Sequence, residues 1–333
     1  MANIPLTRGQ FLLPFVGILR DSGSPVSSTL EKFRLPSALE EKSQLYIPLM
    51  PAIRFIEAAQ RSQGIEDFGF LATQRLHYSH LRDKTRALIE HSPTLLVALQ
   101  HACKWAARED TILSLWIEHH VDHVRICSRL SGTSALRHLE HSQWLQLVFP
   151  VYIVRQFAGP DWMPDTIAFE ARYTPGRATL ALWPNVRFLS GQHASWISVP
   201  IAHLSLSIRA GASIPPPLDT EDGPSGYDIV ELIKLMLPAY LDENTPTLAV
   251  VAEMAGVSTR TLQRKLYHIG LTYSDILETV RYENASKLLR STDSKIIDIA
   301  YSSGYTDPAH FSRAFRRISG VTPRQFRDRS RLG

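Results

Sequence analysis

Residues 251–266 read VAEMAGVSTRTLQRKL, and residues 299–315 read IAYSSGYTDPAHFSRAF. The second stretch repeats the pattern of the first. Matching residues are 48 apart for Ala252 with Ala300 and Gly256 with Gly304, and 49 apart for Leu262 with Phe311, Arg264 with Arg313 and Leu266 with Phe315. The additional residue falls in a turn, where an insertion disturbs packing least. We therefore expect two copies of one helix-turn-helix unit, which suits a partner with two sites along its length, such as successive major grooves of DNA.

The first unit has clear helix start and stop signals. Thr247 is expected to cap a helix that ends at Gly256, because glycine adopts the positive φ of a tight turn without steric cost. Ser258 then caps a second helix whose periodicity buries Leu262 and Leu266. The side chains left on the outward face of this helix are Arg260, Thr261, Gln263 and Arg264. Arginine pairs bidentately with guanine and glutamine with adenine, so we predict that these four residues contact base edges.

The second unit repeats this build with different side chains. Gly304 makes the turn, and Asp307 caps a helix that has Pro308 at its first position. The outward face carries Pro308, Ala309, Ser312 and Arg313, which we also predict to contact bases. Pro308 and Ala309 offer only apolar contacts to a thymine methyl group. We therefore expect the first unit to carry more sequence information and the second to contact more of the DNA backbone.

A helix predicted over residues 273–289 joins the two units. Thr272 and Asp275 form the capping-box pattern at its start. Its 17 residues give a rod of roughly 25 Å, comparable with the ~34 Å between successive major grooves on one face of DNA.

A last helix begins at Thr322 and Pro323. Four arginines around this end are predicted to contact phosphates: Arg316, Arg317, Arg324 and Arg327.

Charge and composition divide the chain. Residues 244–333 hold 14 Lys and Arg against 8 Asp and Glu, which leaves 22 against 24 in residues 1–243. A basic end on a near-neutral body indicates that the end alone meets a polyanion. Three consecutive prolines within residues 208–226 favour an interdomain linker. We expect an effector-binding and dimerisation domain over 1–207, this linker, and a DNA-binding domain over 227–333.

The body shows helical periodicity first and strand-like patterns later. A hairpin is predicted near residues 111–127, a long helix over 143–157, and short strands over 166–170, 178–182 and 194–199. This order predicts an α+β effector domain with a helical front end, followed by an all-α domain in which a linker helix joins two helix-turn-helix units.

The body also holds the candidate sensor residues. Its tryptophans include three in elements expected to enclose a cavity, and we predict an effector pocket at Trp116, Trp144 and Trp196. Histidines gather in the hairpin and beyond it at His119, His120, His123, His138 and His141. A metal or haem site there is conceivable, but no cysteine or carboxylate completes a ligand set, so we expect no metal and no cofactor.

At these residues the chain resembles a known family. Residues 227–326 resemble the DNA-binding domain of AraC/XylS-family bacterial transcription regulators, and the segments 299–305, 311–317 and 320–327 carry the signature. The resemblance implies seven helices and one bipartite DNA reader per subunit. The body resembles the N-terminal domain of the arabinose-operon regulator, through residues 93–95 and 186–201. Family members often carry a larger polar or aromatic residue where Pro308 and Ala309 stand.

We therefore expect a transcription regulator, acting as an activator, that binds promoter DNA in response to a small molecule. RNA polymerase and a second copy of the chain are further expected partners. The alternatives are an architectural DNA-binding protein without an effector, or an enzyme with a DNA-targeting tail. Cys103 and Cys127 lie in no reactive motif, and no GxSxG, HExxH or P-loop motif appears, so no enzyme is expected. The start of the chain lacks the build of an export signal and no apolar run could span a membrane, which predicts a bacterial cytoplasmic protein, nucleoid-associated when bound.

Overall fold

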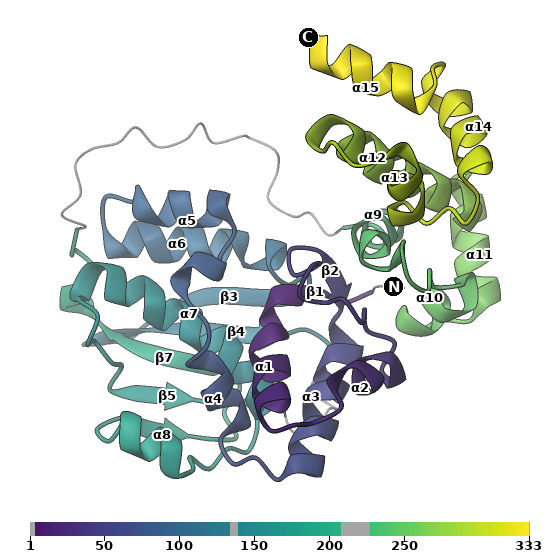
Figure 1. Cartoon of the computed structure of the whole chain (residues 1–333). Coiled ribbons are helices and arrows are strands. Elements are labelled where there is room, and N and C mark those ends of the chain that lie inside the picture. The colour runs from purple at the N-terminus through teal and green to yellow at the C-terminus, as the bar shows by residue number, and fades with distance from the viewer. Residues whose placement is uncertain (1–3, 134–138, 208–226, 333) are drawn as a thin grey trace. The chain divides into compact units, whose positions relative to one another are not determined.

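The computed structural model describes residues 4–133, 139–207 and 227–332 (Figure 1). Within these residues the chain forms two compact units. The larger unit contains residues 7–43, 49–133 and 139–207, and the smaller contains residues 227–332 with two short segments, 4–6 and 44–48. The predicted linker, 208–226, lies outside the described residues.

A mixed sheet forms one side of the larger unit. Its strands are β3 (Leu113–His119), β4 (His123–Leu130), β5 (Thr166–Ala168), β6 (Arg187–Leu189) and β7 (Ser195–Pro200). They lie in the order β3-β4-β7-β5-β6, and only β5 and β6 pair in parallel among the described strands. The expected hairpin is confirmed as β3 and β4, with Trp116 opposite Cys127.

Helices cover this sheet and form the front end of the same unit (Figure 1). They are α1 (Leu13–Asp21), α2 (Val26–Lys32), α3 (Leu49–Gln63), α4 (Phe68–Thr73), α5 (Asp83–Glu90), α6 (Leu95–Trp105), α7 (Glu140–Ala158) and α8 (Arg177–Leu182). The long α7 packs against α4, α6 and β7. Its Trp144 is 1% exposed and lies among the rings of Phe70, Phe169 and Trp183. The predicted α+β class, with a helical front end, is confirmed.

The strand predicted over residues 178–182 is wrong, because this segment is the helix α8. Its first turn is held by a carboxylate distant in sequence. Asp67 accepts hydrogen bonds from the backbone N–H of Gly176 at 2.8 Å and of Thr179 at 3.0 Å. These N–H groups have no acceptor within their own helix, so a buried acid stabilises the helical form. The apolar alternation of the segment carried no sign of this partner.

The smaller unit is helical. It contains α9 (Ile229–Met236), α10 (Leu248–Met254), α11 (Thr259–His268), α12 (Tyr273–Ser291), α13 (Ile296–Ser302), α14 (Pro308–Ser319) and α15 (Pro323–Leu332), with a 3-10 turn, η5, over Leu237–Tyr240. Residues 227–332 thus hold the seven expected α-helices. The strand β2 (Tyr46–Pro48) also belongs to this unit and packs against α9 and η5. It pairs with β1 (Leu6–Arg8).

Candidate DNA interface

The two turns of the repeat have the same backbone geometry. Gly256 and Gly304 have φ of +64° and +79°. The residue after each glycine donates its N–H to the alanine five positions back, Val257 to Ala252 and Tyr305 to Ala300, both at 3.0 Å. Each of these is the longer bond of a Schellman motif. The glycine N–H donates the shorter bond of the same turn, Gly256 to Glu253 at 3.0 Å and Gly304 to Tyr301 at 2.9 Å. The pattern found in the sequence is therefore a structural repeat of α10 and α11 in α13 and α14.

The helix α11 presents most of the predicted base-contacting residues of the first unit. Ser258 caps it by accepting the N–H of Thr261 at 3.2 Å, and the two hydroxyl groups lie 2.8 Å apart. Leu262 and Leu266 are buried, as expected. Three predicted contact residues are exposed: Arg260, Gln263 and Arg264. Thr261 is half-buried and engaged with the cap, so its methyl group is better placed than its hydroxyl to meet a base.

The helix α14 is poorer in free polar groups. Asp307 caps it by accepting the N–H groups of Ala309 at 2.9 Å and His310 at 3.1 Å. These bonds, the one from Ala309 foremost, lower the pKa of Asp307, so the cap is ionised at neutral pH. Arg313 lies 3.8 Å from this carboxylate. Ser312 donates its hydroxyl to the carbonyl of Pro308 at 3.0 Å.

The four residues of α14 that are predicted to contact bases differ in exposure. Ala309 and Arg313 are exposed, while Pro308 and Ser312 are half-buried. A negative charge at the start of the helix opposes the approach of phosphate there. Arg313, although close to that charge, is 71% exposed along its side chain and free to reorient toward DNA.

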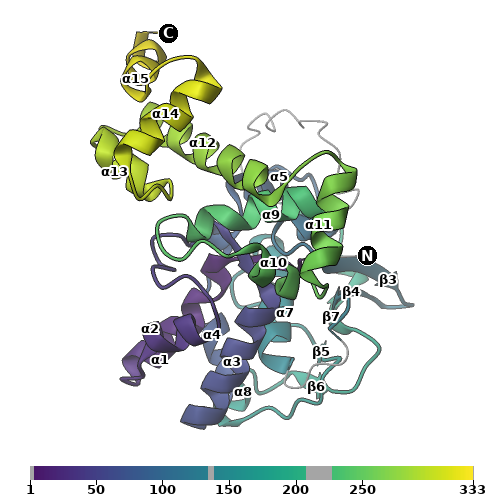
Figure 2. The ribbon, with the colours of Figure 1, turned by 90° about the vertical axis from the view of Figure 1, so that its right-hand side faces the viewer.

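The helix α12 joins the two helix-turn-helix units (Figure 2). Its 19 residues extend to Ser291, two beyond the prediction, and correspond to about 28 Å. The expected capping box is present, with Thr272 donating its N–H to Asp275 at 2.8 Å. From the middle of α12, Asn284 donates to the carbonyl of Ser302 at 3.0 Å, and the rings of Tyr282 and Phe315 lie 5.0 Å apart. The second unit is thereby fixed to α12.

The four arginines predicted to contact phosphate differ in availability. Arg316 and Arg324 are exposed, and no partner for either is found among the described residues. Arg317 pairs with Glu278 of α12. Arg327 donates to the carbonyl of Ser294 at 2.6 Å, which leaves part of its guanidinium for other partners. Part of the positive charge of the DNA-binding region is therefore compensated by acidic side chains and carbonyl groups of the same region.

Two family models match this chain. A helix-turn-helix domain model matches residues 251–329, and a model described as the N-terminal arabinose-binding domain of the AraC transcription regulator matches residues 23–208, more than half of the chain. The chain belongs to the AraC family of transcription regulators. As in the family, an N-terminal effector-type domain precedes the helix-turn-helix region, and this AraC-family regulator is a DNA-binding protein.

Individual relatives are similar over different parts of the regulator. It is 22% identical to the HTH-type transcriptional regulator VirS of Mycobacterium tuberculosis over 333 residues, which covers 97% of this chain and 96% of VirS. It is 45% identical to the HTH-type transcriptional activator RhaS of Enterobacter sp. over 78 residues, 23% of this chain and 28% of RhaS. The chain thus spans little more than a quarter of the RhaS length. The crystal structure of the regulator CdpR from Pseudomonas aeruginosa is 18% identical, covers 95% of this chain and 96% of its own, and has a TM-score of 0.41.

The predicted sensor residues of this AraC-family regulator are distributed through the N-terminal unit. Trp144 is in the core, Trp196 is 3% exposed beneath the guanidinium of Arg125 at 4.1 Å, and Trp116 donates to Glu118 at 2.9 Å. None of the three lines the cavity of about 100 Å³ that this unit contains. That cavity lies elsewhere, among residues that no pattern in the sequence marks as a pocket.

The histidines form no metal centre in the part of the chain that the structure describes, where no three His, Cys, Asp or Glu side chains converge. His120 and His123 stack at 4.8 Å between ring centroids, and His141 accepts from the N–H of Gly69 at 3.2 Å. His138 lies outside the described residues.

None of the helices in the described part of the chain has the length and apolar character needed to span a lipid bilayer.

Proposed function

We propose that this AraC-family regulator reads two successive major grooves of a promoter with α11 and α14, in response to a small molecule bound by its N-terminal domain. The observation that carries the proposal is the matched geometry of the two turns, which gives α11 and α14 equivalent positions in their units. The single helix α12 follows α11 in the chain and packs against α13, and its length suits the spacing of neighbouring grooves.

Within this proposal the two units have different tasks. The exposed arginines and glutamine of α11 supply hydrogen bonds to base edges, whereas α14 supplies apolar contact and Arg313. Arg316 and Arg324 supply phosphate contact, with Arg317 and Arg327 as further candidates. The first unit therefore carries most of the sequence preference, and the second adds affinity and fixes the register.

The proposed test is footprinting of the full chain on the DNA that flanks its own gene. We expect protection of two segments centred about one helical turn apart on one face of the duplex. Inserting about five base pairs between them turns one segment to the opposite face and should abolish joint protection. Unchanged protection of both segments after that insertion would show that the units do not bind as a pair.

We further propose that a homodimer acts on RNA polymerase at the promoter, in the bacterial cytoplasm and on the nucleoid. Activation is supported by the similarity of the DNA-binding region to RhaS, which is named an activator. Transcription from the footprinted promoter, with and without the protein, tests the direction of control.

An enzyme with a DNA-targeting tail is less well supported. A repair alkyltransferase of this kind requires a reactive cysteine, and both cysteines are poor nucleophiles because burial raises the pKa of Cys103 to about 11 and of Cys127 to about 12. An architectural role is also less well supported, since a protein without a signal needs no N-terminal domain of this size.

A further inference from the structure

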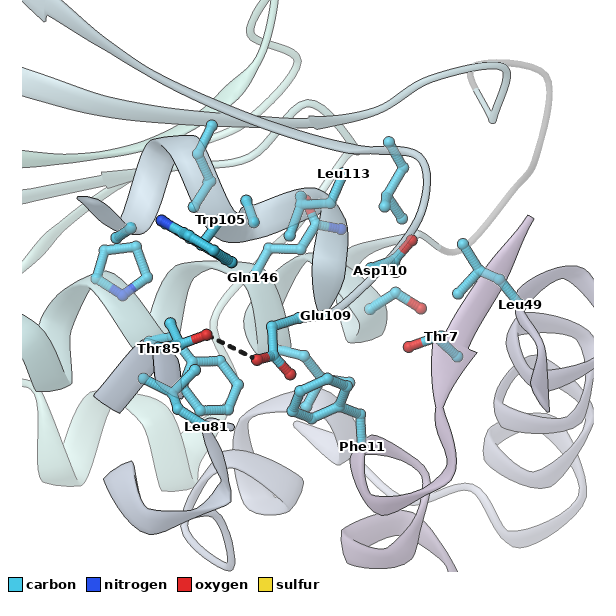
Figure 3. A pocket seen from close by; sticks show the side chains of 18 of the residues that line it. Thr7, Phe11, Leu49, Leu81, Thr85, Trp105, Glu109, Asp110, Leu113 and Gln146 are labelled. Atoms are coloured by element: carbon cyan, nitrogen blue, oxygen red, sulfur yellow. Dashed lines mark hydrogen bonds between the residues drawn. The ribbon is translucent and has the colours of Figure 1, made fainter. Parts of the chain in front are cut away.

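The N-terminal unit contains a cavity of about 100 Å³ built from many segments (Figure 3). Its walls come from β1, α3, α5, α6, β3 and α7, and most are aliphatic or aromatic. Representative wall residues are Phe11, Ile53, Trp105, Leu113, Phe149 and Ile153. A mostly apolar cavity with a few convergent polar groups is the usual form of a small-molecule site.

Two polar side chains in this cavity have hydrogen-bonding capacity that the protein leaves unused. Gln146 of α7 is 9% exposed, and no acceptor among the described residues reaches its Nε2. Asp110 is also 9% exposed. Its Oδ1 accepts the N–H of Ile112 at 3.3 Å, and no donor to its Oδ2 is found among the described residues. Buried groups of this kind are normally paired, so unused capacity at a cavity wall points to a ligand.

The neighbouring carboxylate, by contrast, is fully engaged. Glu109 pairs with Arg8 at 2.7 Å, and both side chains are buried. Its other oxygen accepts the N–H of Arg82 at 3.2 Å and the hydroxyl of Thr85 at 3.4 Å. The charge of Glu109 is therefore compensated by the protein. Among the described lining residues the remaining ionisable group is Asp110, which has no cation of its own.

We propose that this cavity binds a small primary amine with a short apolar body, whose ammonium group faces Asp110. The ammonium supplies the donors that Asp110 lacks, and the short alkyl body contacts the apolar wall. Gln146 can donate to an oxygen or a second heteroatom on the ligand. An anionic ligand is disfavoured, because it would place a second negative charge beside Asp110 with no free cation in the lining.

The size of the cavity limits the ligand. A cavity of about 150 Å³ accommodates benzene, so this one suits a body of about five non-hydrogen atoms, such as butylamine. The binding of an amine in this cavity does not depend on the proposed function; only the role of that amine as the effector rests on it. Its test therefore measures binding without DNA, so that failure of the ligand site and failure of DNA recognition are separate results.

Ionisation of Asp110 gives the proposal a second readout. Burial raises the pKa of this carboxyl to about 7, and the other ionisable residue of the lining, Glu109, is paired with Arg8. An ammonium ligand binds the ionised form, and alkylamines remain protonated across this range. Affinity should therefore rise with pH up to about 7 and then level off, whereas binding of a neutral alcohol should not rise.

The experiment is calorimetric titration of the full chain with butylamine, 1-butanol and butyrate. We expect butylamine to bind most tightly, and Asp110→Asn to weaken it by at least about tenfold, since a charge-assisted bond is lost. The matched control is Asp161→Asn at an exposed aspartate outside the cavity lining, which should leave binding unchanged.

Several results would overturn the proposal. These are tighter binding of butyrate or 1-butanol than of butylamine, equal binding of butylamine to wild type and Asp110→Asn, or no binding of butylamine at millimolar concentration. A folded Asp110→Asn protein, shown by its circular dichroism spectrum and melting curve, excludes misfolding as the cause of a loss.

Discussion

Arg317 on α14 is paired with Glu278 on α12, so the protein itself compensates one of the arginines expected to meet phosphate. The two side chains are 39 residues apart and come from different helices. Their exposure, 68% for Arg317 and 34% for Glu278, makes the pair a weak contributor to stability but leaves it next to the face proposed for DNA.

Removing Glu278 should strengthen DNA binding. In Glu278→Gln, Arg317 is released for phosphate, and we expect several-fold tighter binding to all sequences with a salt dependence steeper by up to about one unit of slope. Fluorescence anisotropy at several salt concentrations measures both. The control is Glu283→Gln, which removes the same negative charge from an exposed position on the same helix. Equal effects of the two variants would mean that net charge, rather than release of Arg317, is responsible.

Arg264→Ala should relax the choice of sequence. We expect a loss of about 1–3 kcal/mol on the footprinted site and little loss on random DNA, because a bidentate base contact is removed. Competition gel shifts with specific and scrambled duplexes measure the two losses. The control is Arg172→Ala, an exposed arginine of the N-terminal unit. A loss of the same size on both duplexes contradicts the assignment of Arg264 to a base.

The two turn glycines should respond unequally to alanine. A Cβ on Gly304 would lie 2.8 Å from the carbonyl oxygen of Leu241, whereas one on Gly256 would meet nothing within 4 Å. Gly256→Ala therefore bears mainly the cost of positive φ, about 1–2 kcal/mol, and Gly304→Ala adds a clash with backbone. Urea unfolding curves should show the larger loss for Gly304→Ala. The reverse order would mean that the described approach of Leu241 to the turn is incorrect.

Asp110→Asn should stabilise the protein increasingly as pH rises. Burial raises the pKa of Asp110 to about 7 from an ordinary value of 3.8, so the folded state holds a proton that the unfolded state releases. Stability contributed by this group is present below about pH 4 and is lost as pH rises toward 7. An asparagine at this position does not ionise, so the free energy of unfolding of Asp110→Asn should exceed that of the wild type by at most about 4 kcal/mol near pH 7. Melting temperatures of both proteins from pH 4 to 8 measure the difference, which should be absent near pH 4.

The DNA-binding region could be derived from sequence because its signals are local. A capping side chain lies within three residues of the N–H that it accepts, and a turn glycine acts on its own φ. Thr272, Ser258 and Asp307 cap the helices that they were expected to cap. Helical periodicity then separates Leu262 from Arg264, so most of the exposed face was predictable, although Thr261, Pro308 and Ser312 are half-buried.

The N-terminal unit shows where this reasoning fails. The segment Arg177–Leu182 is a helix because of Asp67, more than one hundred residues earlier in the chain. An effector pocket at Trp116, Trp144 and Trp196 stays a prediction, and the residue type alone does not show that Trp144 is 1% exposed in the core. A cavity is what remains after many segments have packed, so no local pattern marks the residues that line it.

By itself the sequence determined that the chain carries two helix-turn-helix units at a fixed spacing, because turns, caps and periodicity act over a few residues. Tertiary structure alone decided that Glu278 compensates Arg317, that Asp67 holds α8, and that Asp110 and Gln146 share one cavity. Each of these depends on contacts between residues far apart in the chain, and the free energy of such contacts exists only once the chain has folded around them.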